Sequence, residues 1–307
     1  MPSKHRKALF AVMLVVTCAA TLRAQESPPP APAARQELPP TNDPKEIVRR
    51  ALDVDQSDFQ LARNYTYEER EEMKVLGKGG AVKKREINTY DVTMVYGEAY
   101  TRRIGKNDKP LSEKDEEKEA EKANKFVAER ENESEKEHQK RVEKQEKERQ
   151  EERAFVRDII NAYDFQILGD EQVDGHDTFV IAATPRKDFR PTQPHADILP
   201  KLQGKLWISK KDYGWVKLDV ETLDTISWGL LIMRIHKGAQ IRFEQTRVND
   251  EIWLPRSLSL NANMRVALVA SGDIDMEWSY SKYKKFAVQV LPGAEEVKPT
   301  ADPPRQK

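Results

Sequence analysis

The sequence has little cysteine, no excess of charge of either sign and no long hydrophobic run. A single cysteine among 307 residues excludes a disulfide framework and a thiolate metal cluster. Lysine and arginine number 52, as do aspartate and glutamate, so we expect no nucleic-acid partner, which would need a basic excess on one face. The apolar run at residues 8–16 is too short to cross a bilayer, which takes about 20 residues. We therefore expect no transmembrane span in the mature chain.

Residues 1–24 have the pattern of a secretory signal peptide. Lys4, Arg6 and Lys7 precede the apolar run, and small residues follow it as far as Ala24, after which we expect cleavage and export to the periplasm. Cys18 stands where a lipoprotein signal places its acylated residue, and acylation there would attach the protein to the outer membrane. Thr17 is a poor residue before such a cysteine, so we favour the alternative that Cys18 is removed with the signal peptide.

Proline marks both ends of the predicted folded domain. Residues 25–44 contain seven prolines, which predicts an extended linker without helix or sheet. Residues 291–307 hold four more and are expected to be a disordered tail. The domain itself is therefore expected at residues 45–290.

Residues 113–153 form a block of charge, with 16 acidic and 12 basic residues in 41 positions and neither proline nor glycine. Glutamate and lysine recur four positions apart, as in Glu143 and Lys147, and each such pair supports a helix by about 0.2–0.5 kcal/mol. The sustained apolar positions of a coiled coil are missing. We predict one long charged, solvent-exposed helix, or a helical hairpin, in an insertion at residues 112–163. Its last turns should dock on the body through Phe155, Val156, Ile159, Ile160 and Tyr163.

The remaining pattern is that of β-strands. A short capped helix is predicted from Asp43-Pro44, and about eleven strands follow, with turns at residues 211–212, 249–250 and 272–273. The strands are predicted at residues 65–75, 82–96, 98–104, 165–173, 178–184, 204–209, 213–221, 240–248, 252–261, 266–271 and 274–283. Locally joined strands make an antiparallel sheet, and one this wide must curl. The predicted fold is mainly β with helices: an antiparallel open or half β-barrel with capping helices.

Signatures of catalysis and of metal binding are missing. The sequence has no Gly-x-Ser-x-Gly, His-Glu-x-x-His, Walker or Cys-x-x-Cys motif. Asp170, Asp174, His176 and Asp177 lie close in sequence, but turns prefer residues of this kind. We therefore expect no catalytic residues, no metal site, no cofactor and no enzymatic activity.

Four segments run in order along the chain: YGEAY at residues 96–100, DGHDTFVI at 174–181, GKLWI at 204–208 and TRVNDEIWLP at 246–255. Together they resemble the LolA/LolB-like, outer-membrane lipoprotein-sorting family of periplasmic proteins. The resemblance covers residues 45–105 and 155–290, and the charged insertion is a departure from LolA. It implies an open β-barrel whose concave apolar face accepts acyl chains, with helices as a lid and no catalysis.

Two functions of different classes follow. The first is an exported, non-enzymatic carrier or sensor that binds a lipid, an acyl chain or a lipoprotein in the apolar concave face. The alternative is a structural or interaction protein of the envelope, without a ligand cavity, whose charged helix at residues 113–153 docks a protein partner. Residues 226–235, the most apolar stretch after the signal, are either plain core or a lid. Candidate ligand-binding residues are Trp207, Ile226, Trp228, Leu230, Met233 and Trp253.

Overall fold

A computed structural model of the chain describes residues 39–285 apart from 97, 194, 229–232 and 267–269. The predicted signal peptide with Cys18, most of the proline-rich linker and the C-terminal tail lie outside the described residues. The predictions for these segments stay predictions.

The sheet begins with a meander that follows the predicted strands closely. Asn107 and Asp108, with φ of 51° and 56°, form the tight turn before its last strand, because these residues tolerate the positive φ that both turn positions need. A longer turn with a 3-10 helix, η2 (Lys78–Gly80), joins the first two strands. The four strands are β1 (Tyr65–Leu76), β2 (Val82–Val95), β3 (Glu98–Lys106) and β4 (Lys109–Pro110).

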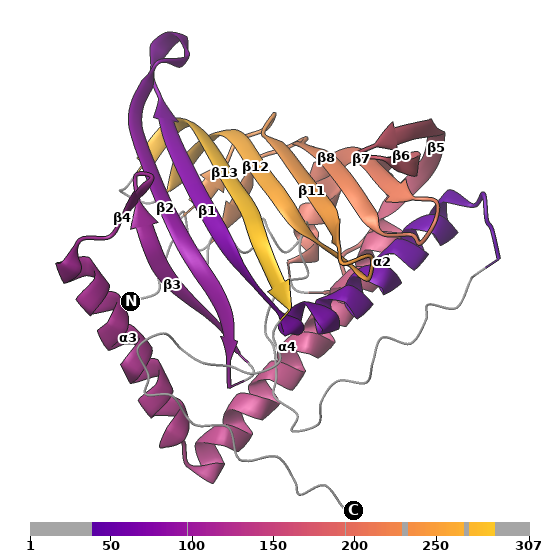
Figure 1. Cartoon of the computed structure of the whole chain (residues 1–307). Helices are drawn as coiled ribbons and strands as arrows, with labels where there is room; N and C mark the ends of the chain where they lie inside the picture. Colours follow the sequence, from indigo (N-terminus) through magenta and orange to yellow (C-terminus); the bar gives the residue numbers. More distant parts are fainter. Residues whose placement is uncertain (1–38, 97, 194, 229–232, 267–269, 286–307) are drawn as a thin grey trace, which may run out of the picture.

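The charged insertion then carries the chain from one edge of the sheet to the other. It consists of two helices, α3 (Glu113–Glu131) and α4 (Glu135–Ala162), which form a V whose apex points away from the sheet (Figure 1). Of the two predicted alternatives, one long helix or a helical hairpin, the insertion therefore forms the hairpin. The first helix ends at Glu131 with Asn132 as its C-cap, and Ser134 starts the second, because its side chain and that of Glu137 cap each other's backbone N–H groups.

The rest of the chain builds the sheet back from the far edge. The strands are β5 (Tyr163–Val173), β6 (His176–Pro185), β7 (Leu202–Ser209), β8 (Trp215–Thr222), β9 (Ile226–Trp228), β10 (Met233–Ile235), β11 (Gln240–Val248), β12 (Ile252–Val266) and β13 (Ala270–Lys285). β13 then pairs with β1, which joins the two halves of the sheet. The order is β4-β3-β2-β1-β13-β12-β11-β8-β7-β6-β5, antiparallel throughout. β9 and β10 form a small hairpin beside β12.

This arrangement confirms the predicted fold class, an open antiparallel sheet with helices. In the described part of the chain the sheet has thirteen strands, and its two edge strands, β4 and β5, do not pair with each other. One local prediction was wrong. The expected turn at residues 272–273 lies inside β13, where Gly272 is paired opposite Met264 and Asp273 opposite Asn263. Pairing with the neighbouring strand therefore overrides the local turn preference, and the separate strand expected at 266–271 is absent from the described residues.

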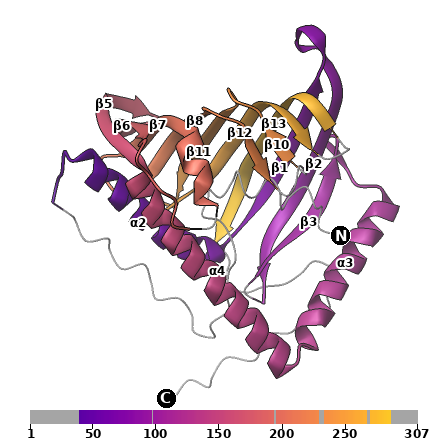
Figure 2. The same ribbon diagram turned by 180° about the vertical axis from the view of Figure 1, so that it is seen from behind.

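The helices cover one face of the sheet. The first helix, α2 (Pro44–Leu61), begins as predicted, with Pro44 in its first turn and the Asp43 side chain accepting a hydrogen bond from Lys45 N, but at 18 residues it is longer than the short helix expected. Figures 1 and 2 show α2 and α4 crossing beneath the strands β5 to β11. The main apolar core lies between these two helices, the 3-10 helix η3 (Ala196–Lys201) and the inner face of the sheet.

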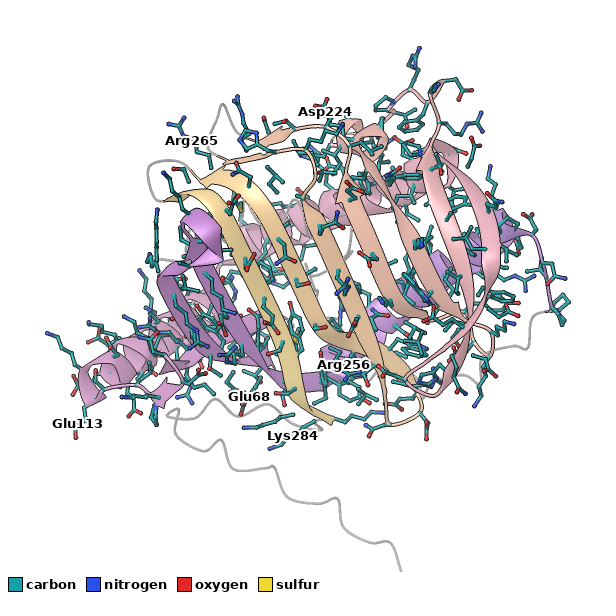
Figure 3. The ribbon with its side chains drawn as sticks, turned by 90° about the horizontal axis from the view of Figure 1, so that it is seen from above. Glu68, Glu113, Asp224, Arg256, Arg265 and Lys284 are labelled. Carbon is teal, nitrogen blue, oxygen red and sulfur yellow. The ribbon has the colours of Figure 1, made fainter. Side chains whose placement is uncertain are left out.

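The other face of the sheet carries charged side chains. Figure 3 looks onto this outer face with the helices behind it, and labels Glu68, Arg256 and Lys284 there. Several of the charges are paired across strands, as Glu68 with Lys282 at 2.8 Å and Arg256 with Asp174. Pairs of this kind are exposed and contribute about 0–1 kcal/mol each, so the part of the outer face that carries them is solvated.

Candidate ligand-binding cavity

A cavity of about 100 Å³ lies between α2, α4 and the inner face of strands β5 to β8. Its wall is largely apolar, and the polar side chains in it are Asp55, Gln56 and Gln203. The apolar part of the wall is made by Val48, Leu52, Phe155, Val156, Ile159, Tyr163, Phe165, Ala183, Leu199, Leu202, Gly204, Leu206, Trp215, Leu218 and Val220. A hollow of this composition suits an apolar body with one polar group.

The helical side of the cavity follows from the spacing of apolar residues. In α2, Val48 and Leu52 are one turn apart and therefore share a face, which is buried together with Ile47 and Ala51. In α4, Phe155 is 3% exposed, and Val156 and Ile159 pack on the same core. The prediction that the last turns of the charged insertion dock on the body is confirmed by these contacts.

A buried carboxylate fixes α4 over the cavity. Asp158 is 3% exposed and accepts hydrogen bonds from Thr192 N at 2.8 Å, Thr192 Oγ1 at 2.7 Å and Gln193 N at 3.1 Å. These bonds tie α4 to the connection between β6 and η3. Tyr163, the first residue after α4, is held in the same region because its hydroxyl donates to the Leu199 carbonyl at 2.8 Å. Burial raises the pKa of this phenol, so the hydroxyl stays protonated and keeps its role as a donor.

The sheet side of the cavity depends on one glycine. A Cβ at Gly204 would lie 2.4 Å from the Asp219 carbonyl oxygen and 3.0 Å from Val220 Cγ2. No side chain fits there, so glycine allows the close approach of β7 and β8 at this point of the cavity wall. Leu206 and Leu218 face each other across the same two strands and continue the floor.

One carboxyl group sits in the apolar wall. Asp55 retains some exposed surface as a residue, but its carboxyl group is enclosed, and this burial raises its pKa to about 7, with repulsion from Asp58 adding to the shift and a hydrogen bond from Gln245 opposing it. Asp58 is 3% exposed and accepts a hydrogen bond from Trp253 N at 3.0 Å. The two acids, three positions apart, therefore lie side by side on the buried face of α2.

The structure separates the residues that the sequence proposed for the ligand. Trp207 lies between Leu206 and Ile208 in β7, and since those two face the main core, Trp207 faces the opposite side of the sheet. It packs there with Trp253, Val180 and Val216, a set that we call the outer tryptophan cluster. The Trp207 indole donates to Glu171 Oε2 at 2.7 Å, and Lys217 Nζ lies 4.5 Å from the centre of its ring.

Of the remaining predicted residues, the structure describes the side chain of Ile226 alone. Ile226 is 2% exposed and belongs to the main core. Trp228 and Met233 are paired across the small hairpin of β9 and β10, while Leu230 lies outside the described residues. Their contact with a ligand stays a prediction. The residues that do line the cavity were missed, although the stripe of Val48, Leu52 and Asp55 in α2 was a signal that could have located its helical side.

The outer part of the insertion docks on the sheet at a second, smaller place. In α3, Ala123, Phe126 and Val127 pack against Val95 and Tyr100, with the rings of Tyr100 and Phe126 5.0 Å apart. Glu119 of α3 is 5% exposed and is neutralised by Lys122 Nζ at 2.5 Å and by Arg103 Nη2 at 3.9 Å. The insertion is thus anchored at both ends, on β3 by α3 and near β5 by α4.

Two features of the described residues bear on the class of protein, their potential metal ligands and the character of their helices. In the part of the chain that the structure describes, no three His, Cys, Asp or Glu side chains are gathered as metal ligands would be. Across the same residues, no helix has the length and apolar character needed to cross a membrane.

Comparisons with known proteins give structural neighbours only. No family model matches the sequence, and no curated protein matches it. An outer membrane lipoprotein-sorting protein domain from Vibrio parahaemolyticus is similar at 12% identity and a TM-score of 0.31, over 77% of this chain and 92% of its own. A DUF1329 family protein from Desulfovibrio piger is similar at 14% identity and a TM-score of 0.30, over 80% of this chain and 94% of its own. A LolA superfamily protein from Nitrosomonas europaea is similar at 11% identity and a TM-score of 0.28, over 81% of this chain and 94% of its own.

Proposed function

We propose that this protein is an exported, non-enzymatic carrier or sensor of the bacterial envelope, which binds the acyl chain of a lipid or lipoprotein in the cavity between α2, α4 and the sheet. The observation that carries the proposal is the cavity itself, an apolar hollow left open in the core of the half-barrel. Burial of an alkyl chain there supplies about 0.8 kcal/mol per methylene group. The predicted signal peptide supports a periplasmic location.

The proposal explains why the inner face of the sheet is not packed solid. A protein of purely structural function gains stability when such a space is filled, since each buried methyl group that is missing costs about 1 kcal/mol. Here the wall residues come from α2, α4 and four strands, so the space is maintained by the fold as a whole.

Native mass spectrometry of the protein purified from its host tests the proposal directly. We expect a mass increment that corresponds to a lipid and that disappears after delipidation. The delipidated protein should then take up N-phenyl-1-naphthylamine, an uncharged apolar fluorophore, with a rise in fluorescence. A protein that carries no lipid and takes up no fluorophore would refute the proposal.

A pair of matched variants locates the binding. Ala183→Phe places a ring in the cavity wall and should lower fluorophore uptake about tenfold or more, because it fills the space that the ligand needs. Ala182→Phe is the control, since the neighbouring residue in β6 faces the other side of the sheet. Equal uptake by the two variants would place the ligand elsewhere.

The alternative function, partner docking through residues 113–153, rests on a different observation. Between its two anchoring points the insertion presents charged side chains to solvent, among them Lys125, Lys136 and Lys140. Replacing these three lysines with glutamate should leave fluorophore uptake unchanged. If residues 113–153 dock a protein partner, the same variant should lose an envelope protein that co-purifies with the unaltered chain.

A further inference from the structure

The buried face of α2 is apolar in its first half and acidic further along the helix. Val48 and Leu52 line the cavity, and Asp55 follows at the next position of the same face, three residues after Leu52. Asp55 therefore takes a place where the pattern of the helix calls for an apolar side chain. A carboxylate in such a position is unfavourable unless it has a partner.

The structure supplies no cation for Asp55. None of the described lysines and arginines forms an ion pair with it, and its acidic neighbour Asp58 repels a second negative charge. Asp58 has a structural explanation in its bond to Trp253 N, whereas Asp55 points into the cavity wall. Within the described residues, the side chain of Gln245 donates a hydrogen bond to it.

Gln245, which is not itself part of the cavity wall, is hydrogen-bonded to Asp55 and carries an unpaired acceptor. The residue lies on the inner face of β11 and is 8% exposed. Its amide nitrogen is used by Asp55, while its Oε1 atom is buried and has no hydrogen-bond partner within the described structure. A buried acceptor without a donor costs about 1–3 kcal/mol. Asp55 thus presents an acceptor in the cavity wall, with the unpaired Gln245 oxygen next to it, and a ligand in the cavity is the natural source of a donor for Asp55.

We infer that the ligand of this cavity is an amphiphile with a cationic, hydrogen-bond-donating head group such as a primary amine, held by Asp55 with its alkyl chain among Leu52, Leu206 and Leu218. The inference rests on the proposed function and specifies its ligand class. An ammonium group has three donors and a positive charge, so it pairs with Asp55 and offers a donor toward Gln245. A fatty-acid carboxylate has neither, and it meets the like charges of Asp55 and Asp58.

Two probes of equal chain length test the head group. Decylamine and decanoate are titrated into the delipidated full-length mature protein at pH 8 by isothermal calorimetry, below the concentrations at which either aggregates. We expect decylamine to bind at least tenfold more tightly than decanoate. The Asp55→Asn variant should reduce this ratio to less than threefold, and Asp55→Leu should do the same while leaving an apolar wall.

The control for general attraction of amines to an acidic protein is Asp53→Asn. Asp53 lies on the same helix but is exposed and pairs with Arg49 at 2.6 Å, so its replacement removes the same charge from outside the cavity. The ratio should stay at the unaltered value. If decanoate binds as tightly as decylamine, or if Asp55→Asn leaves the ratio unchanged, the head-group assignment is wrong while the lipid-binding proposal stands. If neither probe binds, the proposed function itself is wrong and the inference falls with it.

Discussion

Asp55 makes the stability of this protein depend on pH in an unusual direction. Its pKa in the folded protein is about 7 and its ordinary value is 3.8, so the folded state holds this proton more tightly than the unfolded state. The free energy of unfolding contributed by Asp55 is therefore highest below pH 4 and falls as the pH rises toward 7. A carboxylate whose pKa is lowered, such as Glu72 beside Arg85 with a pKa of about 2, has the opposite dependence.

We predict that Asp55→Asn stabilises the protein at pH 8. The amide keeps the shape of the side chain but is never charged, so the cost of burying a carboxylate is removed. The melting temperature should rise by at least about 2–4 °C, the shift that 1 kcal/mol produces in a domain of this size. The gain should be absent at pH 4, where Asp55 is protonated in the folded state. The melting temperature is measured by circular dichroism at both pH values, with Asp53→Asn as the control. An equal gain at pH 4 and pH 8 would contradict the raised pKa of Asp55.

Gly204 is the second residue whose replacement has a defined consequence. Alanine there brings a Cβ to 2.4 Å from a backbone oxygen of the neighbouring strand, which cannot move without disturbing the pairing of β7 with β8. We predict that Gly204→Ala lowers the free energy of unfolding by about 1–3 kcal/mol.

Gly77→Ala is the matched control for this substitution. A Cβ at Gly77 would lie 2.6 Å from Lys83 Cε, which is near the end of a flexible side chain, and its φ of −105° suits any residue. Its stability should change by less than about 0.5 kcal/mol. Urea unfolding of the two variants decides the point, and equal midpoints would argue against the close approach of β7 and β8.

At the scale of elements, the insertion is held to the sheet by few contacts at its α3 end. Phe126 stacks near Tyr100 at 5.0 Å, and the Arg130 guanidinium lies 5.0 Å from the centre of the Phe126 ring. Such a small cluster predicts that α3 opens locally more easily than the main core.

We predict that Phe126→Ala releases α3 without unfolding the sheet. An aromatic pair of this kind contributes about 0.5–1.5 kcal/mol beyond its buried area, so amide hydrogen exchange in residues 113–131 should become about tenfold faster or more. Exchange in β11 and β12 should stay as it was. Lys125→Ala, a substitution at an exposed position of the same helix, is the control. An acceleration spread evenly over the whole domain would show instead that α3 is part of the central folding unit.

At the scale of the whole molecule, the insertion is the link between the two edges of the sheet. β4 at one edge leads into α3, and α4 leads into β5 at the other edge. The two halves of the chain are also joined directly, because β1 pairs with β13 from Tyr65 opposite Lys285 to Val75 opposite Ile274. A third connection is α2, which belongs to the first half and packs on α4 and on strands of the second half in the main core.

We predict that a chain cut at the apex stays assembled. A specific protease site inserted at residues 132–134 should be cleaved completely, and the two fragments should elute together from a sizing column with unchanged circular dichroism, because the β1–β13 pairing and the packing of α2 on the second half hold them. In 6 M guanidinium chloride the same fragments should separate. Fragments that separate under native conditions would show that the β1–β13 pairing and the α2 contacts together do not hold the halves.

Local patterns in the sequence determined most of the elements of this protein. Alternation of side chains predicted the strands, because the period of two is a property of the chain itself. Paired asparagine and aspartate predicted tight turns at Asn249 and Asp250, both of which have positive φ. The break between α3 and α4 was also present locally, as Ser134 followed three residues later by Glu137, although the prediction left one helix and two as alternatives.

Only the tertiary structure decided where the cavity lies and which residues meet in it. Trp207 and Trp253 are apolar, lie in strands and looked suited to a ligand, but the sheet turns them into the outer tryptophan cluster, whereas α2 brings Asp55 into the cavity wall. The physical reason is that alternation divides residues between two faces without saying which face the helices will cover. That choice depends on how α2 and α4, more than 70 residues apart in sequence, pack across the sheet.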